Sequence, residues 1–178
     1  MLLVSAVRAF APAARGAQHL TRRFISIGDA APAVRVVTEF PLTTKDFSKM
    51  VEGKKNVPDF LEKQDILKEA GIDEVLVYCV NDMAVMEAWA KDQGIEGSMV
   101  SFFADPTSAL TKALDMEMTA EGPAMVLGAG RSKRFTVFFD DGVAKAIGLA
   151  ESEDDPAGDA DPEDTLVDAM LEKMKVAA

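Results

Sequence analysis

The chain has 178 residues, of which 48% are hydrophobic and 28% are charged, the composition of a soluble globular domain with a real core. No apolar run approaches the ~20 residues that cross a bilayer, so no membrane association is expected. The only cysteine, Cys79, excludes an internal disulfide and a multi-cysteine metal site, and it favours a reducing compartment.

The first 25 residues differ from everything that follows. They contain four arginines among apolar and small residues, and the first acidic residue of the chain is Asp29. This composition is typical of an organellar transit peptide. The run that ends in RRFIS favours the mitochondrial matrix, with the plastid as the alternative and processing between Arg23 and Ser26. The competing interpretation is a basic tail that binds an anionic partner. We expect residues 1–25 to be the leader and residues 26–178 to be the folded domain.

Removal of the leader makes the protein strongly acidic. The formal net charge is −11, from 19 Lys+Arg against 30 Asp+Glu. Without the four leader arginines, 15 basic residues remain against the same 30 acidic ones, a net charge of −15. The single histidine, His19, leaves with the leader, which excludes histidine catalysis and histidine metal ligation. Binding to nucleic acid is also excluded, because neutralising phosphates requires clustered Lys and Arg.

The domain begins with a strand and an uncertain connection. Alternating valines after Pro32 predict one short strand or two, broken at Pro41. The stretches TTKDF and VEGKK are predicted to be loop or a weak helical turn. Pro58 then suits the first position of a helix that Gly71 ends.

The rest of the chain alternates between buried strands and helices. Residues 74–80 (EVLVYCV) are nearly all apolar, as in a parallel strand buried on both faces. The expected elements that follow are a helix in NDMAVMEAWAKDQG, a strand in SMVSFFA, a helix in DPTSALTKAL with Asp105 as N-cap and Pro106 at its first position, a hairpin in RFTVFF-DDG-VAKAI and a final helix in TLVDAMLEKMK. This order predicts an α/β fold with a mixed central sheet flanked by helices.

Five stretches in register carry a resemblance to a known family: IGDAAP, VPDFLEKQDILKEAGIDEVLVYCVND, VMEAWAKDQG, ADPTSALTKAL and RSKRF…DDGVAKAI. Together they resemble the type II (type-five, atypical) peroxiredoxins, thiol peroxidases of the thioredoxin-like superfamily. The resemblance implies a redoxin domain that reduces hydrogen peroxide and alkyl hydroperoxides in redox homeostasis. It also implies a homodimer, a glutaredoxin, thioredoxin or glutathione reductant, and no cofactor or metal.

The resemblance fails at one place. In that family an apolar strand and a loop carrying the peroxidatic cysteine and a threonine lie between GKK and VPDF. Here Lys55 is followed by Asn56 and Val57, so the strand, the threonine and the cysteine are all missing. Without a thiolate nucleophile, the chain as written should reduce no peroxide.

Two residues remain as candidates for redox chemistry. By resemblance, Arg134 is the surviving active-site arginine, while Arg131 and Lys133 are neighbours suited to dimer contacts. Cys79 lies within a predicted buried strand, where a thiol has a raised pKa and is inert, so a structural role is the preferred interpretation. Acidic residues between Glu151 and Asp164 lack the spacing of a calcium loop and indicate a solvated segment.

The missing strand leaves several interpretations open. A central strand is not a dispensable loop, because its loss removes ladder hydrogen bonds and a layer of core. The preferred interpretation is that the native protein contains a further segment between Lys55 and Val57 and is an active peroxidase. The alternative is a non-catalytic thioredoxin-like protein that acts as a binding or scaffold protein in mitochondria. An unstable splice product is the third.

Overall fold

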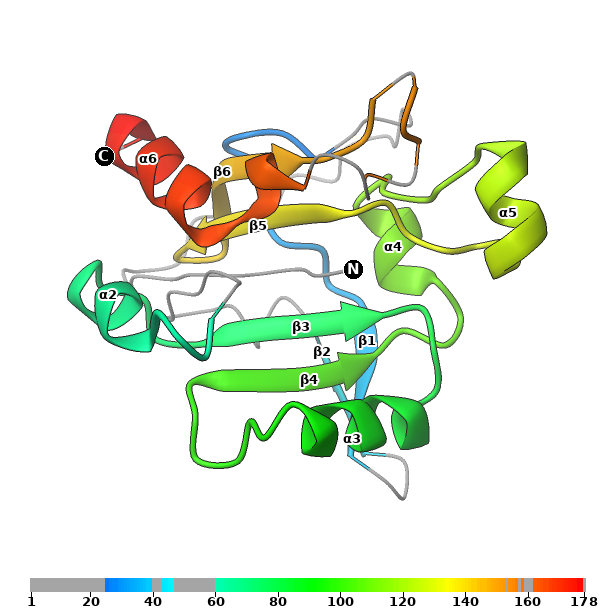
Figure 1. Ribbon diagram of the computed structural model, residues 1–178, viewed down its shortest axis with the longest axis horizontal. Helices are drawn as coiled ribbons and strands as arrows, with labels where there is room; N and C mark the ends of the chain where they lie inside the picture. The colour runs from blue at the N-terminus through cyan, green and yellow to red at the C-terminus, as the bar shows by residue number, and fades with distance from the viewer. Residues whose placement is uncertain are drawn as a thin grey trace.

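The computed structural model describes residues 25–39, 43–46, 60–152, 154–156, 158 and 162–177. Helices and strands alternate through most of this range (Figure 1). The elements are β1 (Arg35–Glu39), β2 (Thr43–Asp46), α2 (Gln64–Glu69), β3 (Val75–Cys79), α3 (Met83–Asp92), β4 (Val100–Ala104), α4 (Ala109–Ala113), α5 (Glu121–Leu127), β5 (Phe135–Asp140), β6 (Val143–Leu149), the 3-10 turn η1 (Glu163–Thr165) and α6 (Val167–Ala177).

Four strands form the larger sheet, in the order β2-β1-β4-β3. β3 and β4 are parallel, in a register that runs from Val75 opposite Val100 to Cys79 opposite Ala104. Parallel neighbours need a crossover connection, and α3 supplies it. The Asp82 carboxylate accepts the Val85 N–H at 3.0 Å and caps α3, so this part of the α/β prediction is confirmed.

The hairpin β5–β6 forms a second sheet of two strands. Its turn residues Asp141 and Gly142 have φ of 51° and 71°. Two consecutive positive φ values are those of a type I′ turn, whose twist matches that of paired strands. The predicted DDG hairpin is therefore present.

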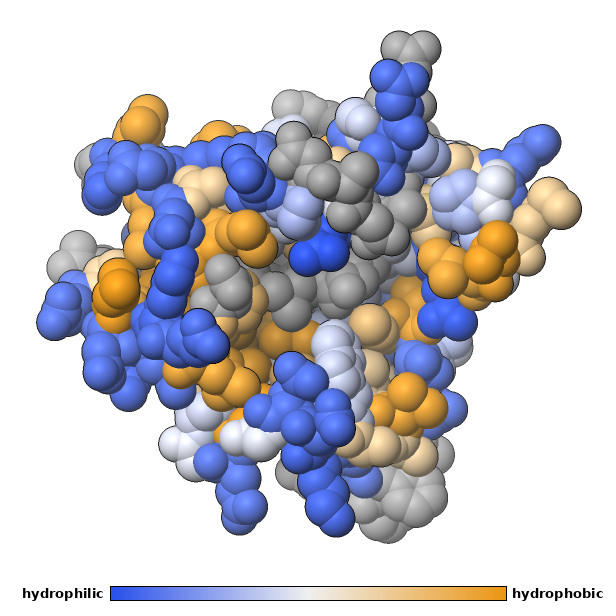
Figure 2. Space-filling view, viewed as in Figure 1, coloured by the Kyte–Doolittle hydropathy of each residue, from blue (hydrophilic) through white to orange (hydrophobic). Residues whose placement is uncertain are grey.

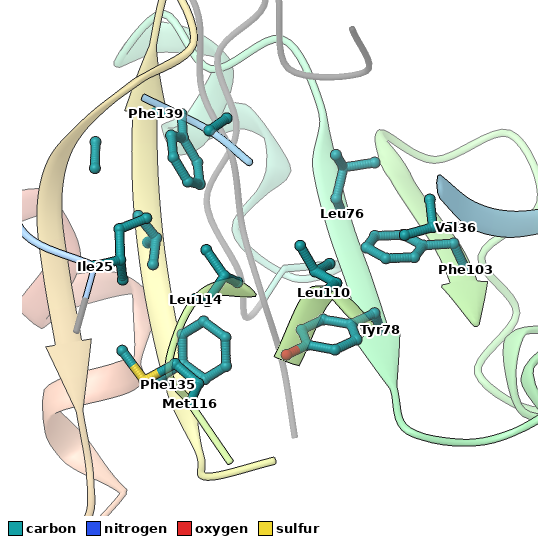
Figure 3. Packing of buried hydrophobic residues seen from close by; sticks show 13 residues of the cluster. Ile25, Val36, Leu76, Tyr78, Phe103, Leu110, Leu114, Met116, Phe135 and Phe139 are labelled. Carbon is teal, nitrogen blue, oxygen red and sulfur yellow. The ribbon is translucent and has the colours of Figure 1, made fainter. Parts of the chain in front are cut away.

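Residues of both sheets pack in the same two apolar clusters, one on each face. On one face, Leu76 and Tyr78 of β3 pack in one apolar cluster with Phe135 and Phe139 of β5 and with α4 (Figure 3). On the other face, alternate residues of β3 pack with Phe138 and with α6. Since side chains alternate along a strand, this sharing means that the sheets lie edge to edge in one layer. Figure 1 shows β5 running opposite to β3.

Three predictions about element boundaries are wrong or lie outside the described residues. Thr43–Asp46 is strand β2 and not loop, because it pairs antiparallel with β1. α2 starts at Gln64, and Pro58 is outside the described residues, as are Pro41 and the VEGKK stretch. Gly71 does follow the helix with φ of 79°. The helix after DPTS starts at Ala109 rather than at Pro106.

Candidate functional site

A buried polar network lies where β3 and β4 end, beside the start of β5. Asp105, 1% exposed, directly follows β4. Its carboxylate accepts the backbone N–H groups of Ala109 at 2.7 Å, Leu110 at 3.2 Å and Thr111 at 2.9 Å, together with the Thr111 hydroxyl at 2.9 Å. Asp105 thus caps α4 from four residues before the helix, which explains why the helix starts later than predicted.

Tyr78 connects this network to the second sheet. Its hydroxyl lies 3.2 Å from Thr111 Oγ1 and 3.2 Å from Ser132 Oγ. Its ring lies edge-on to Phe135, with centroids 6.1 Å apart. Burial raises the pKa of the Tyr78 phenol well above its ordinary range, since a phenolate would be desolvated there. The residue is therefore a neutral hydrogen-bonding group that ties β3 to the start of β5.

The three basic side chains of the RSKR stretch before β5 have different partners. Arg131 donates to Leu127 O at 2.8 Å and to Val80 O at 2.7 Å, so it joins α5 to the end of β3. Lys133 is nearly buried and forms an ion pair with Glu151. Both side chains serve the fold of this chain, in contacts that the sequence did not indicate.

Arg134 is half-buried at the start of β5. Its Nε donates to Thr165 Oγ1 at 3.4 Å, a long bond, and its carbonyl accepts the Ala150 N–H at 3.1 Å. Because side chains alternate, Arg134 points to the face opposite Phe135, toward η1 and α6. The guanidinium therefore lies on the α6 side of the layer, beside η1.

Cys79 lies at the end of β3, half-buried against Met83, Met86 and Ala104. Its carbonyl accepts the N–H groups of Asn81 and Asp105. Alternation along β3 turns the Cys79 side chain away from Tyr78 and toward α3. The two sequence candidates have different described neighbours, since Cys79 packs against Met83 and Met86 of α3 while Arg134 donates to Thr165 of η1.

β3 and β5 do not pair with each other in either sheet of the described residues. The Val75 N–H donates to Met99 O, so by alternation the N–H groups of Leu76 and Tyr78 point away from β4. The Arg134 carbonyl is paired to Ala150, so the N–H groups of Phe135 and Val137 point away from β6. We call the place between these two edges the inter-sheet position.

Helix α5 was not predicted, and it buries none of its residues. Met125 is 87% exposed and Val126 is 83% exposed, and Figure 2 shows this apolar surface over α5 at the right of the view. Its apolar residues lack the spacing of a core-facing stripe, which explains why the pattern was missed. No group of three or more His, Cys, Asp or Glu side chains that could hold a metal occurs among the residues of known placement.

A scan of family models matches residues 54–165 to the model described as Redoxin. Among curated proteins, the chain is 38% identical over 98 residues to "Peroxiredoxin-2E-2, chloroplastic" of Oryza sativa subsp. japonica, covering 55% of this chain and 43% of that protein. It is 39% identical over 98 residues to "Peroxiredoxin-2E, chloroplastic" of Arabidopsis thaliana, covering 55% and 41%. The chain therefore aligns with less than half the length of these relatives.

Solved structures give the same fold. Reduced Prx3 from Vibrio vulnificus in complex with H₂O₂ superposes with a TM-score of 0.70 at 23% identity, covering 85% of this chain and 97% of that one. Peroxiredoxin 5 from Alvinella pompejana superposes with a TM-score of 0.66 at 26% identity, covering 85% and 99%. The predicted thioredoxin-like fold is confirmed. Within the described residues, no helix is long and apolar enough to span a bilayer.

Proposed function

The chain belongs to the redoxin family, and from that premise we propose that its native form is a thiol peroxidase whose nucleophile lies in a segment absent between Lys55 and Val57. The substrates are hydrogen peroxide and alkyl hydroperoxides, and a second thiol is the reductant. The chain as written lacks the cysteine and threonine of the family and is inactive in this proposal.

The observation that carries the proposal is the inter-sheet position. β3 and β5 lie in one layer and share both faces, yet neither is paired to the other. β5 runs opposite to β3 (Figure 1). A strand between them that is parallel to β3 would therefore be antiparallel to β5, and it could pair with both edges. Such a strand would satisfy the N–H groups of Leu76, Tyr78, Phe135 and Val137, which are otherwise costly to bury.

The direction of that strand determines which of its ends, and so which following loop, lies near Arg134. A strand parallel to β3 ends beside Tyr78, where β5 begins with Phe135. A cysteine on the loop after it would therefore come close to Arg134. This is the arrangement that peroxide reduction requires, because a neighbouring cation lowers the pKa of a thiol.

The reaction then proceeds in two balanced steps. The thiolate sulfur attacks one peroxide oxygen, the O–O bond breaks, and the departing oxygen takes up a proton and leaves as water or an alcohol. The cysteine becomes a sulfenic acid, and an incoming thiol attacks it to form a disulfide and release water. Arg134 supplies positive charge near the oxygen on which negative charge develops.

Cys79 is assigned a structural role in this proposal. Its side chain packs in the apolar cluster of Met83, Met86 and Ala104. We expect the chain as written to reduce peroxide no faster than a free thiol. Peroxide turnover that is abolished by Cys79→Ser would contradict this assignment.

An insertion experiment tests the peroxidase directly. A segment consisting of an apolar strand and a loop with Thr and Cys is inserted between Lys55 and Val57, and peroxide consumption is measured with a dithiol reductant. We expect turnover that Arg134→Gln lowers by about 10²-fold, the scale of one lost charge-stabilising donor. The matched control Arg35→Gln, at an exposed arginine of β1, should leave the rate unchanged. A folded insertion variant without turnover would reject the proposal.

The cellular setting is proposed from the relatives and the leader. Both relatives described above are chloroplastic by name, which supports the plastid alternative over the mitochondrial matrix. Fluorescence microscopy of residues 1–30 fused to a fluorescent protein distinguishes the two organelles. Thioredoxin, glutaredoxin and glutathione are the reductants to compare in the peroxide assay.

One observation favours a non-catalytic binding role as the second candidate. Helix α5 exposes Met125 and Val126 and buries none of its residues, as a surface for a protein partner does. The same surface would serve the homodimer of an active enzyme. Sedimentation of the purified chain separates these uses, because a dimer that Met125→Asp dissociates assigns the surface to self-association.

A further inference from the structure

Met125 differs from the other described methionines in its exposure to solvent. It lies on α5 and is 87% exposed. The others are buried or half-buried: Met83, Met86, Met99, Met116, Met118, Met170 and Met174. Methionine sulfur is oxidised by peroxides, and a peroxide must reach the sulfur to react with it. Among the described methionines, we therefore expect Met125 to be oxidised first.

The turn of α5 before Met125 offers its side chain no cover. Long side chains on a helix point back over the residues three and four positions earlier. For Met125 these are Gly122, which has no side chain, and Glu121, which is itself exposed. Apart from the neighbouring helix backbone, a Cβ at Gly122 would meet no atom within 4 Å in the part of the chain that the structure describes. The Met125 thioether is therefore open to small molecules in solution.

The segment that carries α5 leaves the domain and returns to it at neighbouring positions. The Met118 N–H donates to Arg131 O at 2.7 Å and closes this excursion of residues 119–130. Figure 1 shows α5 at the edge of the molecule, away from both sheets. Met116 and Met118, before the excursion, are 2% and 5% exposed. A change of polarity at Met125 therefore alters the surface of the protein and not its core.

We propose that Met125 is a modification site, at which a hydroperoxide converts the thioether to a sulfoxide. The sulfur attacks one peroxide oxygen and loses two electrons as the O–O bond breaks. The other oxygen takes up the proton that the transferred oxygen releases, and it leaves as water or an alcohol. Two thiols of a methionine sulfoxide reductase restore the thioether, with formation of a disulfide and release of water. This inference goes beyond the proposed peroxidase and does not depend on it, since the oxidant reaches Met125 from solution.

Oxidation changes the chemical character of the α5 surface. Val126 and Leu127, next to Met125 in the chain, are also exposed, so the three form one apolar surface. A sulfoxide replaces the apolar thioether of this surface with a polar group that accepts hydrogen bonds. Since α5 buries none of its residues, the fold should be as stable after oxidation as before it. The modification thus makes the surface reversibly less hydrophobic.

Peptide mapping of the folded chain tests the site, because trypsin releases Met116, Met118 and Met125 together in the peptide of residues 113–131. The chain is treated with hydrogen peroxide for increasing times, the reaction is stopped with catalase, and fragment ions locate the sulfoxide. We expect Met125 to be oxidised at least ~10-fold faster than Met116 or Met118, which the fold protects. In concentrated urea the three rates should become similar. Similar rates in the folded chain, or the same preference in urea, would overturn the proposal.

Two variants test the change in surface character by retention on a hydrophobic-interaction column. Peroxide treatment should make the parent chain elute earlier, and Met125→Gln should elute early without treatment. Met125→Leu, which keeps an apolar side chain that peroxide does not oxidise, should not shift. A methionine sulfoxide reductase with a dithiol should restore the retention of the parent chain. A peroxide-induced shift that persists in Met125→Leu would overturn the proposal.

Two further measurements check the assumptions about the fold and about exposure. The midpoint of thermal unfolding should be the same for the parent chain before and after oxidation, and a large decrease would mean that Met125 supports the core. The oxidation rate of Met125 should not depend on protein concentration. A rate that rises on dilution would show that a second copy covers the sulfur, and it would also overturn the proposal.

Discussion

β3 and β4 are neighbouring parallel strands of the same length, and they differ in how their backbones are paired. β4 has a strand on each side, β1 and β3, whereas β3 has only β4 within the described residues. Yet β3 is the more deeply buried strand, with four of its five residues buried against three in β4. An exposed edge strand normally carries charges or proline that prevent further pairing, and β3 (VLVYC) carries neither. β3 therefore has the sequence and burial of an internal strand.

The largest loss of stability is expected from a change in the polar network at the ends of β3 and β4. Asp105→Ala removes the acceptor of three backbone N–H groups and one hydroxyl, all close to Tyr78. Leaving these donors unpaired should lower the free energy of unfolding by about 3–5 kcal/mol. Urea denaturation measures it. Asp105→Asn keeps one acceptor oxygen and should lose about half as much; an Asn variant as unstable as the Ala variant would mean that the charge, not the cap, matters.

The second prediction tests the comparison of the two strands at a matched pair of positions. Leu76 of β3 and Ser101 of β4 lie opposite each other. Leu76→Ala should lower the free energy of unfolding by about 2–4 kcal/mol, as for a fully buried leucine. Ser101→Ala loses only its 2.7 Å hydrogen bond to Glu74 and should cost about 1 kcal/mol. Equal small losses in urea denaturation would show that β3 behaves as an exposed edge.

The third prediction uses Tyr78, the only tyrosine of the chain. Tyr78→Phe removes the hydroxyl that bridges Thr111 and Ser132, and should cost about 1 kcal/mol at neutral pH. Burial raises the pKa of the folded-state phenol above its unfolded value of about 10, so only the unfolded state loses the proton as pH first rises above 10. Stability should then fall with pH in the parent chain.

The same variant checks this sign. Tyr78→Phe should reduce the loss of stability above pH 10, measured by urea denaturation at successive pH values. In the parent chain, ultraviolet phenolate absorbance should rise only as the protein unfolds. Phenolate absorbance that appears near pH 10 in folded protein would mean that Tyr78 is accessible to water.

The smallest losses of stability are expected from the removal of two ion pairs. The Lys133–Glu151 pair is nearly buried at the start of β5. In the Lys63–Asp168 pair, whose charged atoms are 2.8 Å apart, the aspartate side chain is largely exposed. Lys133→Met leaves Glu151 without its partner and should cost about 1–3 kcal/mol. Lys63→Met should cost about 0.5 kcal/mol, as for exposed pairs. Similar losses for both in thermal denaturation would show that Lys133 is more hydrated than its burial indicates.

The sequence predicted most of the elements because their signals are local. The apolar run around Tyr78, the DDG turn and the Asp82 cap each act within a few residues. Helix α5 was missed for a non-local reason, and the start of α4 was placed too early because the Asp105 carboxylate reaches N–H groups four to six residues ahead. Arg131 anchors α5 through Val80, 51 positions earlier in the chain, and Asp105 caps α4 from before Pro106.

The candidate site could be predicted only in part. Arg134 was found through resemblance, since nothing local distinguishes it from Arg131 or Lys133. The different partners of these three cations come from η1, Val80 and Glu151, which only the folded chain brings together. The missing strand was inferred from the junction at Lys55. Its expected neighbours became identifiable only when β3 and β5 were seen to share both faces.

The proposed peroxidase depends most on what lies between Lys55 and Val57 in the native protein. Tryptic peptide mapping by mass spectrometry of protein purified from its source reads this junction directly. If the proposed function is right, residues absent from this sequence follow Lys55 or Asn56, among them an apolar run and a cysteine. A peptide in which Asn56 continues directly through VPDFLEK, with no longer form present, would contradict it.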